Sequence, residues 1–265
     1  MNLRQWQEKR LDELKEIKFI VSGYFDVLTL VIYTFPPAGR EEEMFNWIKC
    51  SILHSWTILG KLKTVIVANA RFAAAEKFAA KSNDFVDLQI AENIIPGNIK
   101  TMSMDCIKNL HSRFSTRYCL VIQDDGFPIN GNIADFLGKY DFIGAPIISD
   151  GWKRALAYSL GLGSFNGGFS LRSHRLCEYA SKMWYSFFSK FMNEDHRHLG
   201  EDFYYTTLLK FLPSTWFRFK FPNMKRAFDF AVDALGSHVT IPDDIRPFGF
   251  HGKDTAELMI ERGLL

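Results

Sequence analysis

The chain has 265 residues, 47% of them hydrophobic and 23% charged, which is the composition of a globular protein and excludes disordered, collagen-like and coiled-coil classes. Its 32 lysines and arginines nearly balance 30 aspartates and glutamates, and a formal net charge of +2 argues against a dedicated nucleic-acid binder. The cysteines lie far apart without a C-x-x-C pair, which predicts reduced thiols rather than a metal cluster or a disulfide framework.

The first residues mix charges of both signs and predict a solvated helix over 4–18, within an N-terminal helical extension over 1–20. They contain no apolar signal-peptide core. No stretch of the chain reaches the roughly 18 uncharged apolar residues that a membrane span needs. We therefore expect a soluble, cytoplasmic protein.

Apolar, β-branched runs alternate with helical patterns as far as residue 145. The predicted strands cover 27–33, 64–68, 84–90, 118–122 and 141–145, and the predicted helices cover 41–58, 71–81 and 101–114. Continuously apolar strands are typical of a mostly parallel sheet with helices on both faces. We therefore predict an α/β fold, in which ligands bind beyond the carboxyl ends of the strands.

The second half of the chain is less regular, with a predicted loop over 146–165 and predicted helices over 173–192 and 201–211. The segment 210–226 interleaves basic and aromatic residues and contains no acid. Alternation over 216–221 predicts an edge strand with one buried face. The alternative is an interfacial patch that meets anionic lipid or a lipid-linked acceptor at the inner face of the cell membrane.

An acidic pair follows the predicted strand that ends at Ile122, in the run Gln123-Asp124-Asp125-Gly126. Adjacent carboxylates repel each other unless a cation or hydrogen-bond donors compensate their charge. Carboxylate oxygens suit Mg²⁺ or Mn²⁺, and such an ion would hold diphosphate oxygens in turn. The alternative is an Asp-Gly turn with solvated carboxylates.

Paired glycines occur in a second motif, Asn166-Gly167-Gly168-Phe169-Ser170-Leu171-Arg172. Such a pair lets the backbone approach a ligand closely and presents N–H groups to an anion. The motif lacks the spacing of a P-loop. A bulge or a turn without a ligand is the alternative interpretation.

Two further motifs contain titratable side chains. Gly200-Glu201-Asp202 stands at the start of a helical pattern, where the acids either compensate the helix dipole or place a general base at a cleft. His251 lies among glycines in Pro247–Gly252, where it is either a structural histidine or one that reaches a metal ion.

Taken in order, these motifs resemble a bacterial family of GT-A-type glycosyltransferases that was first defined as a domain of unknown function. The resemblance runs over roughly residues 25–252. The family elements Q-x-D-x-F, Y-D-[YF]-I-G-A-P, N-G-G-F-S-L-R, E-D-x-[FY] and F-G-F-H-G match residues 123–127, 140–146, 166–172, 201–204 and 248–252. The resemblance implies a single GT-A-like, Rossmann-type domain over 1–265, with a nucleotide-sugar-binding half over 25–145 and an acceptor and catalytic half over 146–252.

The resemblance also implies roles for individual residues. Asp125 corresponds to the final acid of the metal-binding D-x-D-type motif, in which Gln123 replaces the first acid, and His251 corresponds to the late histidine of the metal and diphosphate site. Asp202, with Glu201 beside it, corresponds to the base that deprotonates the acceptor hydroxyl. The implied donor- and substrate-binding residues are Thr34, Gln123, Asp124, Asn166, Gly167 and Gly168.

The implied activity is an inverting transfer of a hexose from a nucleotide sugar to a glycan or lipid-linked glycan, assisted by Mn²⁺ or Mg²⁺. The family's context places it in the synthesis of bacterial surface polysaccharide, either capsule or lipopolysaccharide. Because Gln123 departs from the metal-binding pattern, a non-catalytic sugar-nucleotide or glycan-binding module with a degenerate metal site is the alternative. A phosphoryl- or nucleotidyl-transferring enzyme that uses the same acidic site is a third hypothesis.

Overall fold

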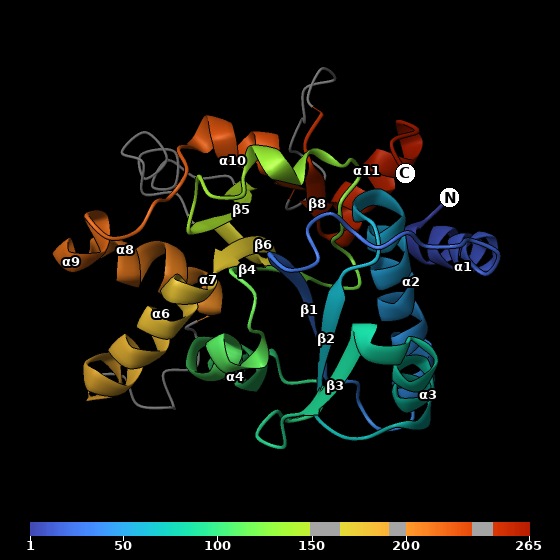
Figure 1. The fold of residues 1–265 in the computed structure, drawn as a ribbon, viewed down its shortest axis with the longest axis horizontal. Helices are drawn as coiled ribbons and strands as arrows, with labels where there is room; N and C mark the ends of the chain where they lie inside the picture. Colours follow the sequence, from blue (N-terminus) through green and yellow to red (C-terminus); the bar gives the residue numbers. More distant parts are fainter. Residues whose placement is uncertain (149–164, 191–199, 235–245) are drawn as a thin grey trace.

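The computed structural model describes residues 1–148, 165–190, 200–234 and 246–265, and within them an eight-stranded sheet crosses the molecule (Figure 1). The strands are β1 (Leu28–Thr34), β2 (Lys63–Ala68), β3 (Val86–Ile90), β4 (Tyr118–Ile122), β5 (Phe142–Ile148), β6 (Phe165–Ser173), β7 (Ala231–Ala234) and β8 (Gly249–His251).

The strands follow the order β3-β2-β1-β4-β6-β5-β7-β8. β6 is antiparallel to its neighbours β4 and β5, and every other neighbouring pair is parallel. This arrangement confirms the predicted α/β fold with a mostly parallel central sheet. The carboxyl ends of β1, β4, β7 and β8 therefore share one edge of the sheet, where the amino end of the reversed strand β6 also lies.

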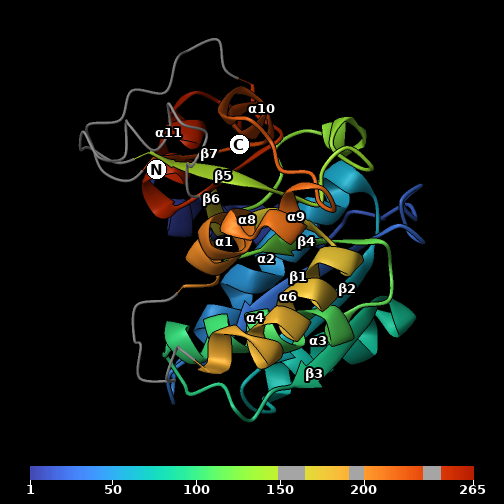
Figure 2. The ribbon, with the colours of Figure 1, turned by 90° about the vertical axis from the view of Figure 1, so that its left-hand side faces the viewer.

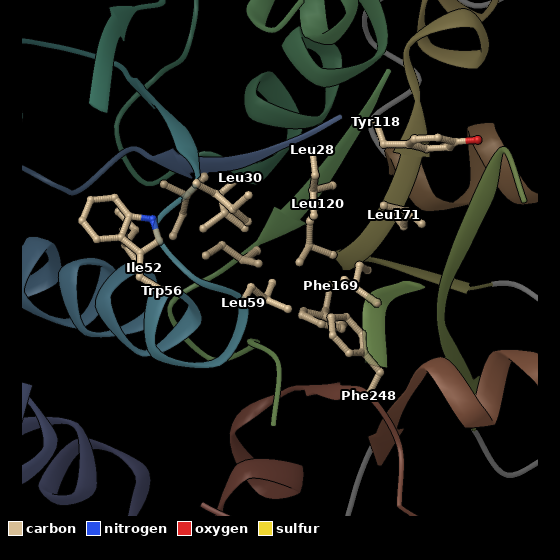
Figure 3. Close-up of a cluster of buried hydrophobic side chains, with 14 of the residues drawn as sticks. Leu28, Leu30, Ile52, Trp56, Leu59, Tyr118, Leu120, Phe169, Leu171 and Phe248 are labelled. Atoms are coloured by element: carbon tan, nitrogen blue, oxygen red, sulfur yellow. The ribbon is translucent and has the colours of Figure 1, made fainter. Parts of the chain in front are cut away.

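Helices cover both faces of the sheet because the side chains of β1 alternate between them. Leu28, Leu30 and Ile32 pack against α2 (Glu41–Leu59) and α3 (Ala73–Lys81). Val31 and Tyr33 pack on the other side with α4 (Ile99–Arg113) and α6 (His174–Ser186). In Figure 2, α4 and α6 lie in front of the strands, and Figure 3 shows Leu28 and Leu30 in the cluster beside Trp56 of α2.

The other helices lie around this core. They are α1 (Leu3–Leu14), α7 (Glu201–Phe203), α8 (Leu209–Phe211), α9 (Pro213–Trp216), α10 (Met224–Phe230) and α11 (Lys253–Glu261), with a π-helical turn over Tyr204–Leu208 and 3₁₀ turns over Asn83–Phe85, Asn132–Asp135 and Phe188–Lys190. α1 contributes Leu3 and Trp6 to a buried cluster with Phe127, Phe250 and Met259, and thus packs near β8 and α11.

Several local predictions differ from the structure. The predicted helix over 201–211 is confirmed, although its middle is π-helical, whereas the helix predicted over 173–192 ends at Ser186. Residues 191–199, and 149–164 of the predicted loop, lie outside the described residues.

The strand predicted over 216–221 is wrong. Pro213, at the first position of α9, starts a helical turn that ends at Trp216. The backbone of Lys220 then bonds to Asp141, accepting from its N–H at 2.7 Å and donating to its Oδ2 at 2.9 Å, instead of joining a strand ladder.

All four cysteines are buried and unpaired, as predicted for reduced thiols. Among the described helices, none has both the length and the apolar character needed to cross a bilayer.

Candidate functional site

The site lies at the sheet edge where β1 and β4 end. From β1 the strand order continues outward through β2 and β3 on one side, and through β4 on the other. In open α/β sheets ligands bind at such a switch point, beyond the carboxyl ends of the strands. Thr34 is the last residue of β1, Gln123 directly follows β4, and His251 is the last residue of β8. The fold thus brings segments distant in sequence to one edge.

A bulge of β6 forms the centre of the site. Gly144 of β5 pairs with Ser170, and the next residue, Ala145, pairs with Asn166, so Gly167–Phe169 leave the ladder. Bulges are common beside active sites because they redirect the chain locally. The sequence analysis gave a bulge without a ligand as the alternative interpretation of this motif. The bulge is present, and it lies within the candidate site.

Both glycines of the bulge lack room for a side chain. A Cβ at Gly168 would collide with Nε2 of His251 and with Oε1 of Gln123. A Cβ at Gly167 would collide with Oδ1 of Asp202. The glycines are thus required because polar site residues press directly against the β6 backbone, and not because of a left-handed backbone conformation.

His251 connects two of the motifs that the sequence singled out. Its Nε2 lies 2.9 Å from Oε1 of Gln123 and 3.5 Å from Oδ1 of Asp125. Burial raises the pKa of Asp125, and its Oδ1 is buried without a hydrogen-bond partner within the described ranges. Burial alone would lower the pKa of His251, but the carboxylates of Asp233 and Asp125 outweigh it and raise the pKa to about 9.

Asp233 of β7 is a site residue that the sequence analysis missed. Its side chain is 1% exposed, and its Oδ2 lies 3.5 Å from Nδ1 of His251. Nδ2 of Asn166 donates to the same oxygen at 2.7 Å, while Oδ1 of Asn166 accepts from the N–H of Gly168 at 2.7 Å. A single acid within a short apolar strand gives no recognisable signal in one sequence.

Asp202 and Glu201 lie together at the start of α7 but have different partners. Oδ1 of Asp202 accepts from the N–H of Gly167 at 2.6 Å, and burial together with the charge of Glu201 raises the pKa of Asp202 to about 8. Glu201 accepts from Oγ of Ser103 at 2.6 Å and lies 3.9 Å from Nη2 of Arg172. The partners of Glu201 are thus the side chains of Ser103 and Arg172, whereas Asp202 contacts the backbone of the bulge.

Arg172 is a second residue whose role the sequence analysis did not assign. The side chain is fully buried and donates to the carbonyl of Gly167 at 3.1 Å and to Oγ of Ser170 at 2.9 Å. Its guanidinium lies 4.7 Å from the centre of the Tyr205 ring. Arg172 therefore holds the backbone of the bulge through hydrogen bonds and supplies a positive charge close to Glu201.

Asp124 and Thr34 lie at the margin of this group. The carboxylate of Asp124 faces α1, where Nη2 of Arg4 lies 2.7 Å away. Thr34 is 1% exposed, and its hydroxyl is buried without a partner among the residues described.

A cavity of about 620 Å³ opens beside Thr34, at the carboxyl ends of β1 to β3. It is lined by Pro36, Ala38, Glu41, Glu42, Asn69, Ala70, Arg71, Phe72, Ala73, Ala74, Lys77 and Pro96. Its volume lies within the roughly 300–1,000 Å³ that is usual for small-molecule sites.

A divalent cation would find two protein ligands here. Within the described ranges, no three His, Cys, Asp or Glu side chains are grouped to hold a metal ion by themselves. The unpartnered Oδ1 of Asp125, in the turn after β4, lies 3.5 Å from Nε2 of His251 at the end of β8. Since Mg²⁺ usually keeps several waters and takes phosphate oxygens from its substrate, this pair fits an ion that a diphosphate also ligates.

A family model described as "Protein of unknown function (DUF5672)" matches residues 84–251, more than half of the chain. Of the site residues described in this subsection, Thr34, Arg4 and the cavity lining other than Pro96 lie outside this range. No curated protein matches the chain significantly.

Three solved structures illustrate the likeness in fold. The mannosyltransferase Ktr4p from S. cerevisiae in complex with GDP is 10% identical, with 77% of this chain and 74% of that chain covered and a TM-score of 0.49. PcManGT from Pyrobaculum calidifontis, in complex with GDP-Man and Mn²⁺, is 14% identical, with 67% and 54% covered and a TM-score of 0.39. Mouse xyloside xylosyltransferase 1 is 11% identical, with 69% and 81% covered and a TM-score of 0.41. At these scores the likenesses carry no weight for substrate or mechanism.

Proposed function

The chain belongs to the DUF5672 family, and from this premise we propose that it is a GT-A-type glycosyltransferase that uses a nucleotide-sugar donor. The observation that carries the proposal is the bulge at Gly167–Phe169, around which the candidate metal ligands Asp125 and His251 and the candidate base Asp202 converge. These residues come from separate motifs of the sequence, and each lies at the edge of the sheet where ligands bind in this class of fold.

The cavity at the carboxyl ends of β1 to β3 supports the donor part of the proposal. Its lining combines the apolar Pro36 and Phe72 with the polar Asn69 and Arg71, which suits a nucleoside. The donor's diphosphate would then extend from this cavity towards Asp125. Thr34 does not line this cavity, but its carbonyl accepts from the N–H of the lining residue Asn69 at 3.3 Å.

Asp125 and His251 would hold Mn²⁺ or Mg²⁺ together with the diphosphate of the donor. When bound, such an ion stabilises the negative charge that develops on the leaving nucleoside diphosphate. Gln123 contacts Nε2 of His251, so the residue that departs from the D-x-D pattern remains part of the site. Asn166 and Gly168 fix the backbone beside the donor sugar.

Asp202 would act as the base that removes the proton from the acceptor hydroxyl. A general base is most effective when its pKa lies near the working pH, and the pKa of Asp202 is raised to about 8. The burial of Asp202 and the negative charge of the neighbouring Glu201 cause this rise in its pKa. A base on the face opposite the leaving group gives inversion at the anomeric carbon, and the hexose would pass to a glycan of a bacterial surface polysaccharide, either capsule or lipopolysaccharide.

A thermal-shift panel of UDP-, GDP-, CMP- and dTDP-sugars, each with and without Mn²⁺, is the direct test of the donor site. A ligand that binds the folded state raises the melting temperature by mass action, so one nucleotide class should give a metal-dependent shift. Asp125→Asn should remove the shift. When the wild type is given donor and acceptor, it should release nucleoside diphosphate and form a product with inverted anomeric configuration. A folded protein that shows no shift with any donor would contradict the proposal.

Gln123, which stands in place of the first acid of the metal-binding motif, favours a second candidate, a sugar-nucleotide or glycan-binding module without catalysis. A sugar-nucleotide-binding module also predicts nucleotide binding, so turnover distinguishes it from the enzyme. If Asp125→Ala leaves a measured transfer activity intact, the assignment of the metal site is wrong. If binding occurs and no donor is consumed with any glycan acceptor, the module is favoured.

Peripheral contact with the inner face of the cell membrane through 210–226 is part of the proposal. Phe217 is 91% exposed beside the basic Arg218, an arrangement that suits an anionic lipid surface. Phe217→Ser should abolish flotation with vesicles that contain anionic lipid. Flotation that is equal for neutral and anionic vesicles, or absent from both, would contradict this contact.

A further inference from the structure

We propose that Asp233 and Asn166 are positioning residues that orient the imidazole of His251 towards the donor diphosphate. The inference rests on the proposed function, because the group that His251 would meet at its Nε2 side is the metal and diphosphate of the donor. It concerns residues on the opposite, Nδ1 side of the ring, one of which no sequence motif contains.

The register of the sheet brings Asp233 and His251 together. β7 and β8 are parallel, and Asp233 pairs with His251 at the carboxyl ends of both strands. Oδ2 of Asp233 lies 3.5 Å from Nδ1, whereas Gln123 and Asp125 lie 2.9 Å and 3.5 Å from Nε2. The two ring nitrogens therefore face different neighbours: Nδ1 makes an ion-pair contact with Asp233 without a hydrogen bond in the described ranges, and Nε2 faces Gln123 and the candidate metal ligand Asp125.

The burial of Asp233 points to a role in the site. A carboxylate that is 1% exposed is costly unless donors or opposite charges compensate it. Its contacts in the described ranges are Nδ2 of Asn166 and the ring of His251, and its other oxygen, Oδ1, is buried without a hydrogen bond there. A buried charge of this kind contributes little net stability to a fold, so we assign it the role of orienting the neighbouring His251.

Asn166 fixes the carboxylate because both ends of its amide are used. Its Nδ2 donates to Asp233 and its Oδ1 accepts from the N–H of Gly168, so only one orientation of the amide satisfies both bonds. Gly168 also leaves the space that the His251 ring occupies. The ring is thus confined by the bulge on one face, by Asp233 at Nδ1 and by Gln123 at Nε2.

A carboxylate beside one nitrogen of a histidine orients the ring and leaves the other nitrogen to face a ligand. Asp233 holds the Nδ1 edge of the ring, so Nε2 faces Gln123 and Asp125. Asn166 and Asp233 accordingly act through His251.

The test compares Asp233→Asn with Asp229→Asn, a matched change of an exposed acid on α10 that pairs with Arg226. The first readout is the pair of side-chain ¹⁵N shifts of His251 in histidine-labelled protein, assigned with His251→Gln. Asp233→Asn should move both shifts, because the ring loses the carboxylate beside Nδ1, and Asp229→Asn should leave them unchanged. Unchanged shifts in a folded Asp233→Asn protein overturn the inference.

The second readout is the affinity for GDP and UDP titrated with Mn²⁺. Loss of such a positioning group typically weakens metal binding by about 10- to 100-fold, so Asp233→Asn should weaken Mn²⁺-dependent binding by that factor. If the nitrogen shifts move while binding stays as in the wild type, the positioning role is overturned. If Asp233→Asn does not fold, Asn166→Ala, which leaves the carboxylate in place, should show the same changes to a smaller degree, and wild-type behaviour of this variant overturns the inference.

The two proposals fail in distinguishable ways. If the wild type binds neither nucleotide with Mn²⁺ and no donor of the four-class panel gives a thermal shift, the proposed function fails, and the nitrogen shifts alone decide whether Asp233 orients His251. If Asp125→Asn abolishes Mn²⁺-dependent binding and Asp233→Asn leaves it unaltered, the proposed function stands and only the inference about Asp233 is overturned.

Discussion

The guanidinium of Arg4 bonds to the carboxylate of Asp124 at 2.7 Å, across 120 positions of sequence. Arg4 also stacks on the ring of Trp47, 3.6 Å from its centre, and Nε2 of Gln7 donates to the carbonyl of Asp124 at 2.5 Å. The N-terminal helix is therefore attached to the acidic motif. Since both charged side chains are about a third exposed, the ion pair itself contributes at most about 1 kcal/mol to stability.

Arg4→Ala should weaken metal-dependent nucleotide binding, while its effect on the free energy of unfolding should be small. Asp124 raises the pKa of Asp125 and Arg4 opposes this effect, so removing Arg4 leaves the two acids with less compensation and raises the pKa of Asp125 further. Nucleotide binding measured against pH should then require a higher pH than in the wild type.

Lys9→Ala is the matched control for Arg4, because Lys9 is an exposed cation on the same helix that, among the described residues, pairs with Glu13 at 4.0 Å. It should bind nucleotide as the wild type does. If Arg4→Ala and Lys9→Ala shift the pH profile of binding equally, the contact between α1 and the acidic motif is irrelevant to the site.

Substitution of the two bulge glycines should damage different steps. Gly168→Ala should displace His251 and weaken donor binding, whereas Gly167→Ala should displace Asp202 and lower kcat while donor binding is kept. Each extra methyl group in a space already filled typically costs about 1–3 kcal/mol of stability. Equilibrium unfolding, nucleotide titration and initial rates measure the three effects separately.

Gly23→Ala provides the control, since a Cβ there would meet nothing within 4 Å. It should behave as the wild type in all three measurements. If Gly167→Ala and Gly168→Ala lose binding and turnover in the same proportion, the division of the bulge between the candidate base and the candidate metal site is incorrect.

The first half of the sheet was predictable because its strands are continuous apolar runs. β1, β2 and β4 are buried along nearly their whole length, and such runs are recognisable without any partner strand. β6 was not predicted because Asn166-Gly167-Gly168 interrupts its apolar pattern at the bulge. β7 and β8 have four and three residues, which is too short for a period to show.

The candidate site was predictable only where a motif marked it. Gln123, Asp125 and His251, which the motifs mark, lie together in the structure, and their roles stay predictions. Asp233 depends on the pairing of β7 with β8, and Arg4 was read as one charge of a solvated helix. Both contacts join distant segments, so they follow from the tertiary fold and leave no local pattern.

Arg172→Met should be among the most destabilising single changes in the site. Arg172 is fully buried beside Glu201, and removing one partner of a buried ion pair typically costs about 3–5 kcal/mol because the other charge stays uncompensated. The double variant Arg172→Met with Glu201→Gln should recover part of that loss in urea unfolding. A double variant with the summed destabilisation of both single changes would show that the two charges do not interact.

The pH dependence of turnover should report Asp202. Because burial and Glu201 raise its pKa to about 8, from an ordinary value of 3.8, the carboxylate needed as a base forms only as the pH approaches 8, and kcat/KM should rise through that pH. The same shift means that the folded state holds the proton more tightly than the unfolded state. Asp202 therefore favours folding fully below about pH 4, and this contribution is lost as the pH rises to about 8.

Asp202→Asn separates the two effects. The amide cannot act as a base, so kcat should fall by about 100- to 10,000-fold while donor binding stays within a few-fold of the wild type. As the pH rises from about 4 to 8, the variant should become more stable relative to the wild type, because the wild type loses the contribution of the protonated carboxyl and the amide does not ionise. A variant that keeps the wild-type rate and rises in kcat/KM through the same pH would assign the base to another residue.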